Sequence, residues 1–337
     1  MANTFTYIIH HFIFSSLILL CAFHESSSNS LSSLRYDYYN QTCPNIEKII
    51  YDVVFQKLSE TPNVAAGALR IFFHDCFVEG CDASVLIASN ATNQAEREAE
   101  INLSLPGDGY DVFFRAKRAL ELHCPGVVSC ADVMAIVTRD LTNRVGGPYW
   151  QVQKGRKDGL ISNRARVEGN LPRPTHTVTE MIHLFQSKGL TTRDLVALSG
   201  AHSIGFTHCT AIMGRIYYNG TYDIDPTMNA TYARDLRTSC PMNNTAPEIV
   251  VFNDVTTPKW FDNAYYGNLK RGYGLLSSDQ NLYLDDRTKW IVESMINDES
   301  AFFDAFASAM EKLGTVGVKT GRDGEVRLQC DFVNGSN

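Results

Sequence analysis

Apolar residues recur at spacings of three and four positions along most of this 337-residue chain. The clearest run carries Ile46, Ile49, Ile50, Val53, Val54 and Leu58 on one face of a helix. The chain shows neither a series of alternating strands nor a strand–helix–strand rhythm, and no unit repeats every ~20–50 residues. The pattern therefore predicts a mostly α-helical protein, a large bundle in two parts with a site between them.

Capping residues and glycines bound the other expected helices. These cover 64–74, 110–122, 129–143, 177–188, 193–199, 229–237, 263–270, 287–297 and 300–313. Thr192 is the expected cap of the helix over 193–199, and Gly189 ends the one before it. The stretch 154–174, rich in Gly, Arg, Asn and Pro, predicts an irregular connection between the front half and the middle section.

The N-terminal residues do not belong to the expected fold. An apolar run over 12–23, too short to span a bilayer comfortably, precedes Ser- and Asn-rich sequence over 26–33. This predicts a signal peptide over 1–30, cleaved between about residues 24 and 33. Since no Lys or Arg precedes the run, a buried N-terminal helix is the alternative. Without a second long apolar run, the mature protein is expected to have no membrane span.

The cysteines agree with export. Of nine cysteines, Cys21 lies in the predicted signal peptide and eight remain, an even number that implies disulfides. Some of the Asn-x-Ser/Thr sequons are expected to carry glycans. They begin at Asn40, Asn90, Asn102, Asn219, Asn229, Asn243 and Asn334. A net charge of −7 without a basic run argues against nucleic acid and anionic membranes as partners.

Arg70 and His74 stand four residues apart, so a helix would present both on one face. A permanent cation beside a group that titrates near neutrality suits the heterolysis of a polar bond. The imidazole would move the proton and the guanidinium would stabilise the developing negative charge. The alternative is a solvated helix face.

Two further clusters contain the oxygen atoms that Ca²⁺ prefers. The first follows His74 directly and comprises Asp75, Asp82 and Ser84, with backbone carbonyls of Val78 and Gly80, in a loop that Cys76 and Cys81 could close. The second comprises Asp254, Thr257 and Asp262. A disulfide-closed polar turn without metal and an Asx-rich turn are the respective alternatives.

His202 follows an apolar helix through Ser-Gly-Ala, small residues that would let a large planar group approach the backbone. A neutral imidazole there could ligate iron, and Asp279 is a candidate carboxylate partner for its other nitrogen. A core histidine with satisfied hydrogen bonds is the alternative.

Together these residues resemble the plant secretory haem peroxidases, often called class III. The similarity runs from Tyr39 to Cys330, nearly the whole mature chain. The motifs that carry it are Arg70-Ile-Phe-Phe-His-Asp-Cys-Phe-Val-Glu-Gly-Cys-Asp-Ala-Ser84, Val128-Ser-Cys-Ala-Asp132, Asp194-Leu-Val-Ala-Leu-Ser-Gly-Ala-His202 and Phe261-Asp-Asn-Ala-Tyr-Tyr266.

The resemblance implies a mostly α peroxidase fold of about ten helices over 31–337, with one haem b between two parts. The distal part would cover about 34–150 with the C-terminal segment, and the proximal part about 151–300. His202 would ligate the iron with Asp279 as its partner. His74 would be the acid–base, Arg70 would stabilise charge, Asn102 would fix the His74 ring and Phe73 would shield an oxo-iron intermediate. Asn102 would then be buried, and its sequon unglycosylated.

Two calcium ions are implied as well. The distal ligands would be Asp75, Val78, Gly80, Asp82 and Ser84, and the proximal ligands Ser203, Asp254, Thr257, Trp260 and Asp262. The implied disulfides are Cys43–Cys124, Cys76–Cys81, Cys130–Cys330 and Cys209–Cys240, which leave Cys21 unpaired.

The implied activity is reduction of H₂O₂ with one-electron oxidation of small phenolic donors at the haem edge, by a secreted, N-glycosylated monomer of the cell wall rather than the vacuole. Pro172 would accept a hydrogen bond from the donor. This chain has Thr175 and His176 where some relatives have two Phe residues, and Gly155-Arg-Lys-Asp158 in place of Gly-Arg-Arg-Asp. The alternatives are a catalytically weak binding protein of this fold and a Cys/His hydrolase or zinc site at His74-Asp75-Cys76.

Overall fold

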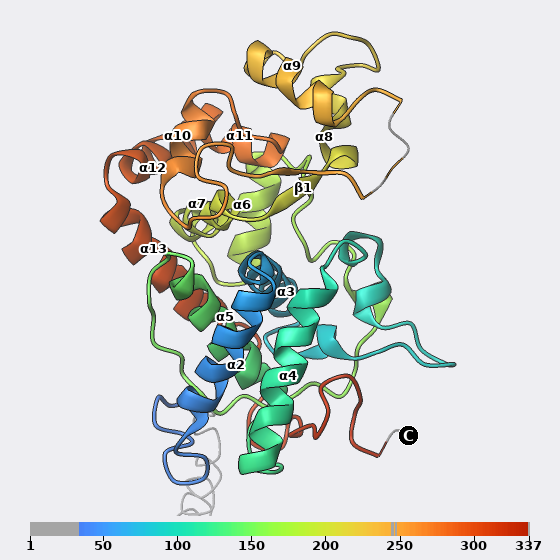
Figure 1. Cartoon of the computed structure of the whole chain (residues 1–337), viewed down its shortest axis with the longest axis vertical. Helices are drawn as coiled ribbons and strands as arrows, with labels where there is room; N and C mark the ends of the chain where they lie inside the picture. The colour runs from blue at the N-terminus through green and yellow to red at the C-terminus, as the bar shows by residue number, and fades with distance from the viewer. Residues whose placement is uncertain (1–33, 244–245, 247, 336–337) are drawn as a thin grey trace, which may run out of the picture. The chain divides into compact units, whose positions relative to one another are not determined.

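Four helices from the first half of the chain pack against one another (Figure 1). The computed structural model describes residues 34–243, 246 and 248–335. The helices are α2 (Ile46–Glu60), α3 (Val64–Phe77), α4 (Gly107–His123) and α5 (Cys130–Arg144). Both α2 and α3 contact α4 and α5, and α4 contacts α5. Their shared face is apolar and buried, as the spacing of three and four predicts.

A second group of helices surrounds α7. It comprises α6 (Val178–Ser187), α7 (Thr192–Ser199), α10 (Ala264–Lys270), α11 (Ser277–Leu284), α12 (Asp286–Asn297) and α13 (Glu299–Leu313). Helix α7 contacts α6, α12 and α13, and Phe261 packs against Phe302 and Phe306 with ring centroids 5.6 and 4.8 Å apart. One hydrophobic core runs through this group and the first.

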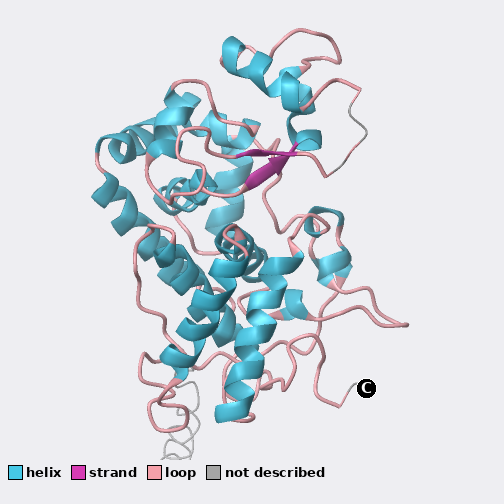
Figure 2. Ribbon diagram, viewed as in Figure 1, coloured by secondary structure: helices cyan, strands magenta, loops and turns pink. Residues whose placement is uncertain are grey.

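A small subdomain has a hydrophobic core of its own. It contains strands β1 (Phe206–His208) and β2 (Val250–Phe252), coloured magenta in Figure 2, with helices α8 (Cys209–Ile216) and α9 (Ala230–Ser239). The strands are antiparallel, with Phe206 opposite Phe252. A disulfide joins Cys209 at the start of α8 to Cys240, just after α9.

Short 3₁₀ helices carry several of the residues that matter below. They are η1 (Ser84–Leu86), η2 (Glu96–Glu98), η3 (Glu100–Asn102), η4 (Arg164–Arg166) and η5 (Gly200–Ser203).

The predicted fold class is confirmed, with three differences. The described residues form twelve α-helices rather than about ten. Helices α8 and α11 were not predicted; α11 buries the polar residues Ser278, Asp279 and Gln280, so it has no apolar stripe to recognise. The cap of α7 is Thr191 and not Thr192, because Thr191 and Asp194 form a reciprocal capping box.

All four implied disulfides are present, and they join distant parts of the chain. Cys43–Cys124 links the start of α2 to the end of α4, and Cys130–Cys330 holds the C-terminal segment to α5. Cys76–Cys81 closes the loop after α3, with an S–S distance of 2.05 Å. The predicted signal peptide with Cys21 lies outside the described residues. Among the described helices, none combines the length and apolarity needed to cross a membrane.

Candidate active site

His74 lies on the last turns of α3 and is held through one ring nitrogen. Its Nδ1 is 2.7 Å from the side-chain oxygen of Asn102 in η3, whose amide nitrogen donates to the carbonyl of Glu96 at 2.8 Å. Because the Asn102 nitrogen is committed as a donor, its oxygen faces His74 and Nδ1 must carry the hydrogen. The other nitrogen, Nε2, therefore has a free lone pair and accepts no hydrogen bond from the described residues.

This environment keeps the His74 imidazole neutral. Burial and then the neighbouring Arg70 charge lower the pKa of His74 to about 3, against a weaker opposing effect of Asn102. At neutral pH, His74 is thus an unprotonated base whose free nitrogen can take up a proton.

Arg70, one turn before His74, is anchored without a counter-ion. Its guanidinium donates to the hydroxyl and carbonyl of Ser104 at 2.9 and 3.1 Å and to the carbonyl of Ile101 at 3.4 Å. No carboxylate of the described residues forms an ion pair with it. Burial lowers the pKa of Arg70, but the group remains cationic at neutral pH. Its charge is therefore available to an anionic species near His74.

Phe73 belongs to an aromatic cluster that joins two groups of helices. Its ring stacks on Phe77 with centroids 4.1 Å apart and lies 6.1 Å from Phe185 of α6. Phe73 keeps some accessible surface, whereas Phe77 and Phe185 are buried. Phe185, which the sequence analysis did not single out, fixes the position of the Phe73 ring.

His202 lies in η5, directly after α7, and is tied to α11. Its Nδ1 is 3.0 Å from both carboxylate oxygens of Asp279. Burial lowers the pKa of His202, but the charge and hydrogen bond of Asp279 outweigh that effect and raise it overall. The Tyr265 ring stands edge-on to the imidazole, with centroids 6.3 Å apart. Within the described residues, Nε2 makes no hydrogen bond.

Close packing explains one of the small residues before His202, namely Gly200. A Cβ on Gly200 would lie 2.5 Å from both the Tyr266 hydroxyl and the Phe302 ring. The absence of a side chain at Gly200 therefore permits the close packing of η5 against α10 and α13. Tyr266 uses the same close packing to donate to the carbonyl of Val196 at 3.0 Å.

His74 and His202 both lie close enough to Arg70 for its charge to affect their pKa values. Burial is the larger cause acting on both pKa values, yet the Arg70 charge also opposes protonation of both His74 and His202. Gly205, just after η5, approaches α3 so closely that a Cβ on it would be 2.9 Å from the Ala66 Cβ. The beginning of α3 and the segment just after η5 are therefore in contact.

The residues of this region fit a haem. The His202 side chain retains 39% of its accessible surface although the residues of α7 before it are buried. Its free Nε2 is a suitable iron ligand, and the Asp279 carboxylate on Nδ1 is the usual partner of a metal-binding histidine. Phe73 and Ala201 add apolar surface that is partly accessible.

Pro172 lies in a segment that bridges the two sides. Arg173 pairs with Glu100 of η3 at 3.2 Å, and the Pro174 carbonyl accepts from the Ser278 backbone of α11 at 2.9 Å. The Pro172 carbonyl itself accepts no backbone hydrogen bond from the described residues. Of the two departures noted above, Thr175 is exposed and His176 accepts from the Arg173 N–H at 3.2 Å.

The five distal calcium candidates converge on one loop. Asp75 accepts from the Ala83 and Val85 backbones at 2.8 and 3.2 Å, and Asp82 from Ser84 at 3.0 Å. Burial and then the Asp82 charge raise the pKa of Asp75 to about 8. Burial also raises the pKa of Glu96, a buried carboxyl near both, and one of its oxygens has no partner in the described part of the chain. A cation would relieve this repulsion.

The five proximal candidates also converge. Ser203 donates to the Trp260 carbonyl at 3.1 Å and accepts from the Asp262 N–H at 3.0 Å. Thr257 donates to Asp262 at 3.0 Å, and Asp254 accepts from the Thr257 N–H at the same distance. Burial raises the pKa of Asp262, and the Asp254 charge adds to this. Hard oxygen atoms from both loops thus suit Ca²⁺.

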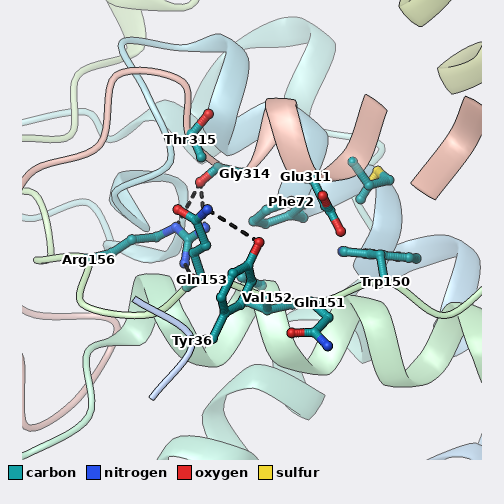
Figure 3. A pocket seen from close by; sticks show the side chains of 12 residues that line it. Tyr36, Phe72, Trp150, Gln151, Val152, Gln153, Arg156, Glu311, Gly314 and Thr315 are labelled. Carbon is teal, nitrogen blue, oxygen red and sulfur yellow. Dashed lines mark hydrogen bonds between the residues drawn. The ribbon is translucent and has the colours of Figure 1, made fainter. Parts of the chain in front are cut away.

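A small cavity is lined by residues of α3, α5 and α13 and of the segment 150–156 (Figure 3). It measures about 20 Å³, room for one water molecule, and is lined by residues that include Phe72, Trp150 and Arg156. Arg156 donates to the Gly314 carbonyl at the end of α13 and to Asp132 of α5 at 2.8 Å. The Gly155-Arg-Lys-Asp158 motif therefore anchors helices, with Asp158 accepting from the Ala131 N–H at 2.9 Å.

Comparisons with known proteins match most of this chain to one family. A family model described as Peroxidase matches residues 50–298. Peroxidase 65 of Arabidopsis thaliana is 51% identical over 310 residues, covering 92% of this chain and 92% of the relative. Peroxidase 41 is 51% identical over 305 residues, with 90% and 92% covered, and Peroxidase 6 is 49% identical over 317 residues, with 94% and 97% covered, both from the same plant.

Proposed function

This chain belongs to the peroxidase family and is a plant class III peroxidase, and we propose that Arg70, His74 and His202 perform its chemistry on H₂O₂. The overall reaction consumes one H₂O₂ and two donor molecules, each of which loses one electron and one proton, and it yields two water molecules.

One observation carries the proposal. His74 and His202 each have Nδ1 held by a side-chain oxygen and Nε2 free, and both imidazoles lie within reach of the Arg70 charge. A pair of anchored imidazoles with free nitrogens supplies a base on one side and an iron ligand on the other.

His202 is the proposed ligand of the haem that the family uses. A bound haem would supply the redox chemistry, which passes two electrons to H₂O₂ and draws them one at a time from two donor molecules. Asp279 holds the Nδ1 hydrogen of His202, so that Nε2 points away from the carboxylate and gains basicity.

His74 and Arg70 handle the proton and the charge of the peroxide. The neutral Nε2 of His74 takes a proton from one peroxide oxygen and returns it to the other oxygen as the O–O bond breaks. Arg70 stabilises the negative charge that develops on the departing oxygen, and its anchors on Ser104 keep it in place. Asn102 holds the His74 tautomer that this transfer requires.

The phenolic donor is proposed to bind near Pro172. The segment that carries Pro172 is attached to η3 on the His74 side and to α11 on the His202 side, and its carbonyl is free to accept from a phenol hydroxyl. Thr175 and His176 offer less aromatic surface than two Phe residues would, so we expect weak stacking of the donor ring there.

Further parts of the proposal concern stability and location. We place Ca²⁺ ions in the two loops described above, and we infer a secreted glycoprotein monomer of the cell wall. Asn102 is buried and its nitrogen donates to the Glu96 carbonyl, so a glycan on that nitrogen would disturb the hydrogen bond that turns the Asn102 oxygen toward His74. A Cys/His hydrolase is excluded, because Cys76 is bonded to Cys81 and has no free thiolate.

The function is tested with haem- and Ca²⁺-loaded protein and a panel of phenols. We expect H₂O₂-dependent oxidation of small phenols, with a KM that changes little as the phenol ring grows because stacking contributes little. Steady-state rates over a series from phenol to bulky methoxyphenols measure this. Absence of peroxide-dependent turnover with every phenol would contradict the proposed donor class.

The low pKa of His74 predicts a flat pH profile. Neutral His74 is the active form, and lowering the pH protonates it only near its pKa of about 3 instead of the ordinary 6.5. The rate constant for reaction with H₂O₂ should therefore be constant from about pH 8 to about pH 5 and decline only in more acidic solution. Stopped-flow measurements across this range decide the matter; a tenfold loss between about pH 6.5 and 5.5 would contradict the assignment.

A further inference from the structure

The two proposed calcium loops differ in their charge. In the proximal loop, Asp254 and Asp262 form no ion pair with any Lys or Arg of the described residues, and Asp254 is completely buried. In the distal loop, the Asp82 carboxylate forms an ion pair with the Lys319 ammonium. The loop after α3 is therefore paired with a cationic side chain, Lys319, before any metal ion binds.

The Lys319 ammonium pairs with a carboxylate that is almost completely buried. The Asp82 side chain is 4% exposed and that of Lys319 is 29% exposed. One Asp82 oxygen accepts from the Ser84 N–H at 3.0 Å and the other faces Lys319. Arg327 is also near, but its guanidinium donates to the carbonyls of Ala83 and Cys330 at 2.7 and 2.6 Å.

The backbone fixes Lys319 in this position. The segment that follows α13 runs along the distal loop, where the Cys81 N–H donates to the Val316 carbonyl at 2.9 Å. Gly80 and Gly317 are so close that a Cβ on either would collide with the other's backbone. Two residues later the Lys157 N–H donates to the Lys319 carbonyl at 2.8 Å. Backbone hydrogen bonds at Val316 and at Lys319 itself thus hold the Lys319 side chain next to Asp82.

We propose that Lys319 is a built-in counter-ion of the distal loop, which stabilises the loop without metal and weakens its affinity for Ca²⁺. The inference rests on the distal calcium site of the proposed function. An ammonium paired with one of the two carboxylates cancels part of the negative charge that attracts Ca²⁺, and the two cations repel each other across Asp82.

The proposal has a reciprocal consequence. If Lys319 lowers the affinity for Ca²⁺, then bound Ca²⁺ must reduce the stabilisation that Lys319 provides, by the same factor. Removing the ammonium should therefore tighten calcium binding and destabilise the calcium-free protein more than the calcium-loaded protein.

The test compares wild type with Lys319→Met and Lys319→Gln, all purified as haem-loaded protein and stripped of calcium with a chelator. Calorimetric titration with CaCl₂ should show that the weaker site binds about tenfold or more tightly in both variants. The rise in Tm that saturating CaCl₂ produces should be larger in both variants than in wild type. Methionine and glutamine differ in shape and polarity. If one variant fails to fold, the calcium affinity of the other still tests the proposal.

Two controls separate charge from packing. Lys319→Arg retains the cation and should behave like wild type. Lys157→Met removes a neighbouring lysine that forms no ion pair with the described residues, and should also leave the calcium affinity unchanged. Equal calcium affinities in wild type, Lys319→Met and Lys319→Gln would overturn the proposal, and so would an absence of calcium binding in all three.

A failure of the proposed peroxidase function can be distinguished from a failure of the Lys319 proposal. Haem absorbance and peroxide turnover of the same samples report on His202 and His74, and neither measurement enters the comparison of calcium affinities.

Discussion

Replacing His74 with leucine should lower the rate constant for reaction with H₂O₂ by about 10²- to 10⁴-fold. Leucine has a similar size but no nitrogen, so the peroxide proton has no acceptor at the position that the neutral Nε2 of His74 now offers. The loss should appear in the peroxide step, while the affinity for haem stays close to wild type because His202 is intact. Stopped-flow spectroscopy under single-turnover conditions separates the two.

Asn102→Leu is a milder variant that tests the same proton transfer. It keeps the imidazole but removes the oxygen that fixes its tautomer, so we expect a smaller loss than in His74→Leu. His183→Leu is the control, since His183 is exposed on α6. A rate constant within a few-fold of wild type in His74→Leu would refute the acid–base role.

Replacing His202 with alanine should abolish retention of haem during purification. Asp279 holds Nδ1 of His202 and leaves its Nε2 free, so alanine removes the nitrogen that we propose as the iron ligand. Haem content per protein, measured by absorbance and by iron analysis, should fall to a small fraction of the wild-type value. The fold should persist, because the His202 side chain is partly accessible.

Asp279→Asn tests the same site more gently. The amide cannot draw the Nδ1 hydrogen as a carboxylate does, and loss of such a partner typically weakens metal binding by about 10- to 100-fold. We expect haem to bind but to transfer faster to an acceptor protein. His123→Ala, at the exposed end of α4, is the control. Stoichiometric haem in His202→Ala would show that another residue ligates the iron.

Most helices could be predicted because their cause is local. The residues of α2 that face the core are three or four apart, and Ser129 and Thr177 mark the starts of α5 and α6 as caps. Helix α11 could not be found in this way, because it buries Ser278, Asp279 and Gln280 in place of an apolar stripe. Its inner face places Asp279 against His202, and a polar inner face of this kind leaves no periodic apolar signal.

Gly200 shows a different limit. The sequence shows it as a small residue in Ser-Gly-Ala, and the structure adds that Tyr266 and Phe302 from distant helices fill the space beside it. A sequence shows that a residue is small and not which neighbour needs the space. The partners of Arg70 illustrate the same point, since Ser104 is 34 residues away and has no motif of its own.

The sequence by itself determined the helical class and, through resemblance, the four disulfide pairs, and it proposed the residues of the site. These follow from local spacing and from long motifs. Only the tertiary structure decided which atoms are free: His74 Nε2 and His202 Nε2, each left over when Nδ1 is bound by a residue 28 or 77 positions away. It alone revealed Lys319 at Asp82, across 237 positions, because an ion pair between distant segments depends on how the backbone returns and leaves no local pattern.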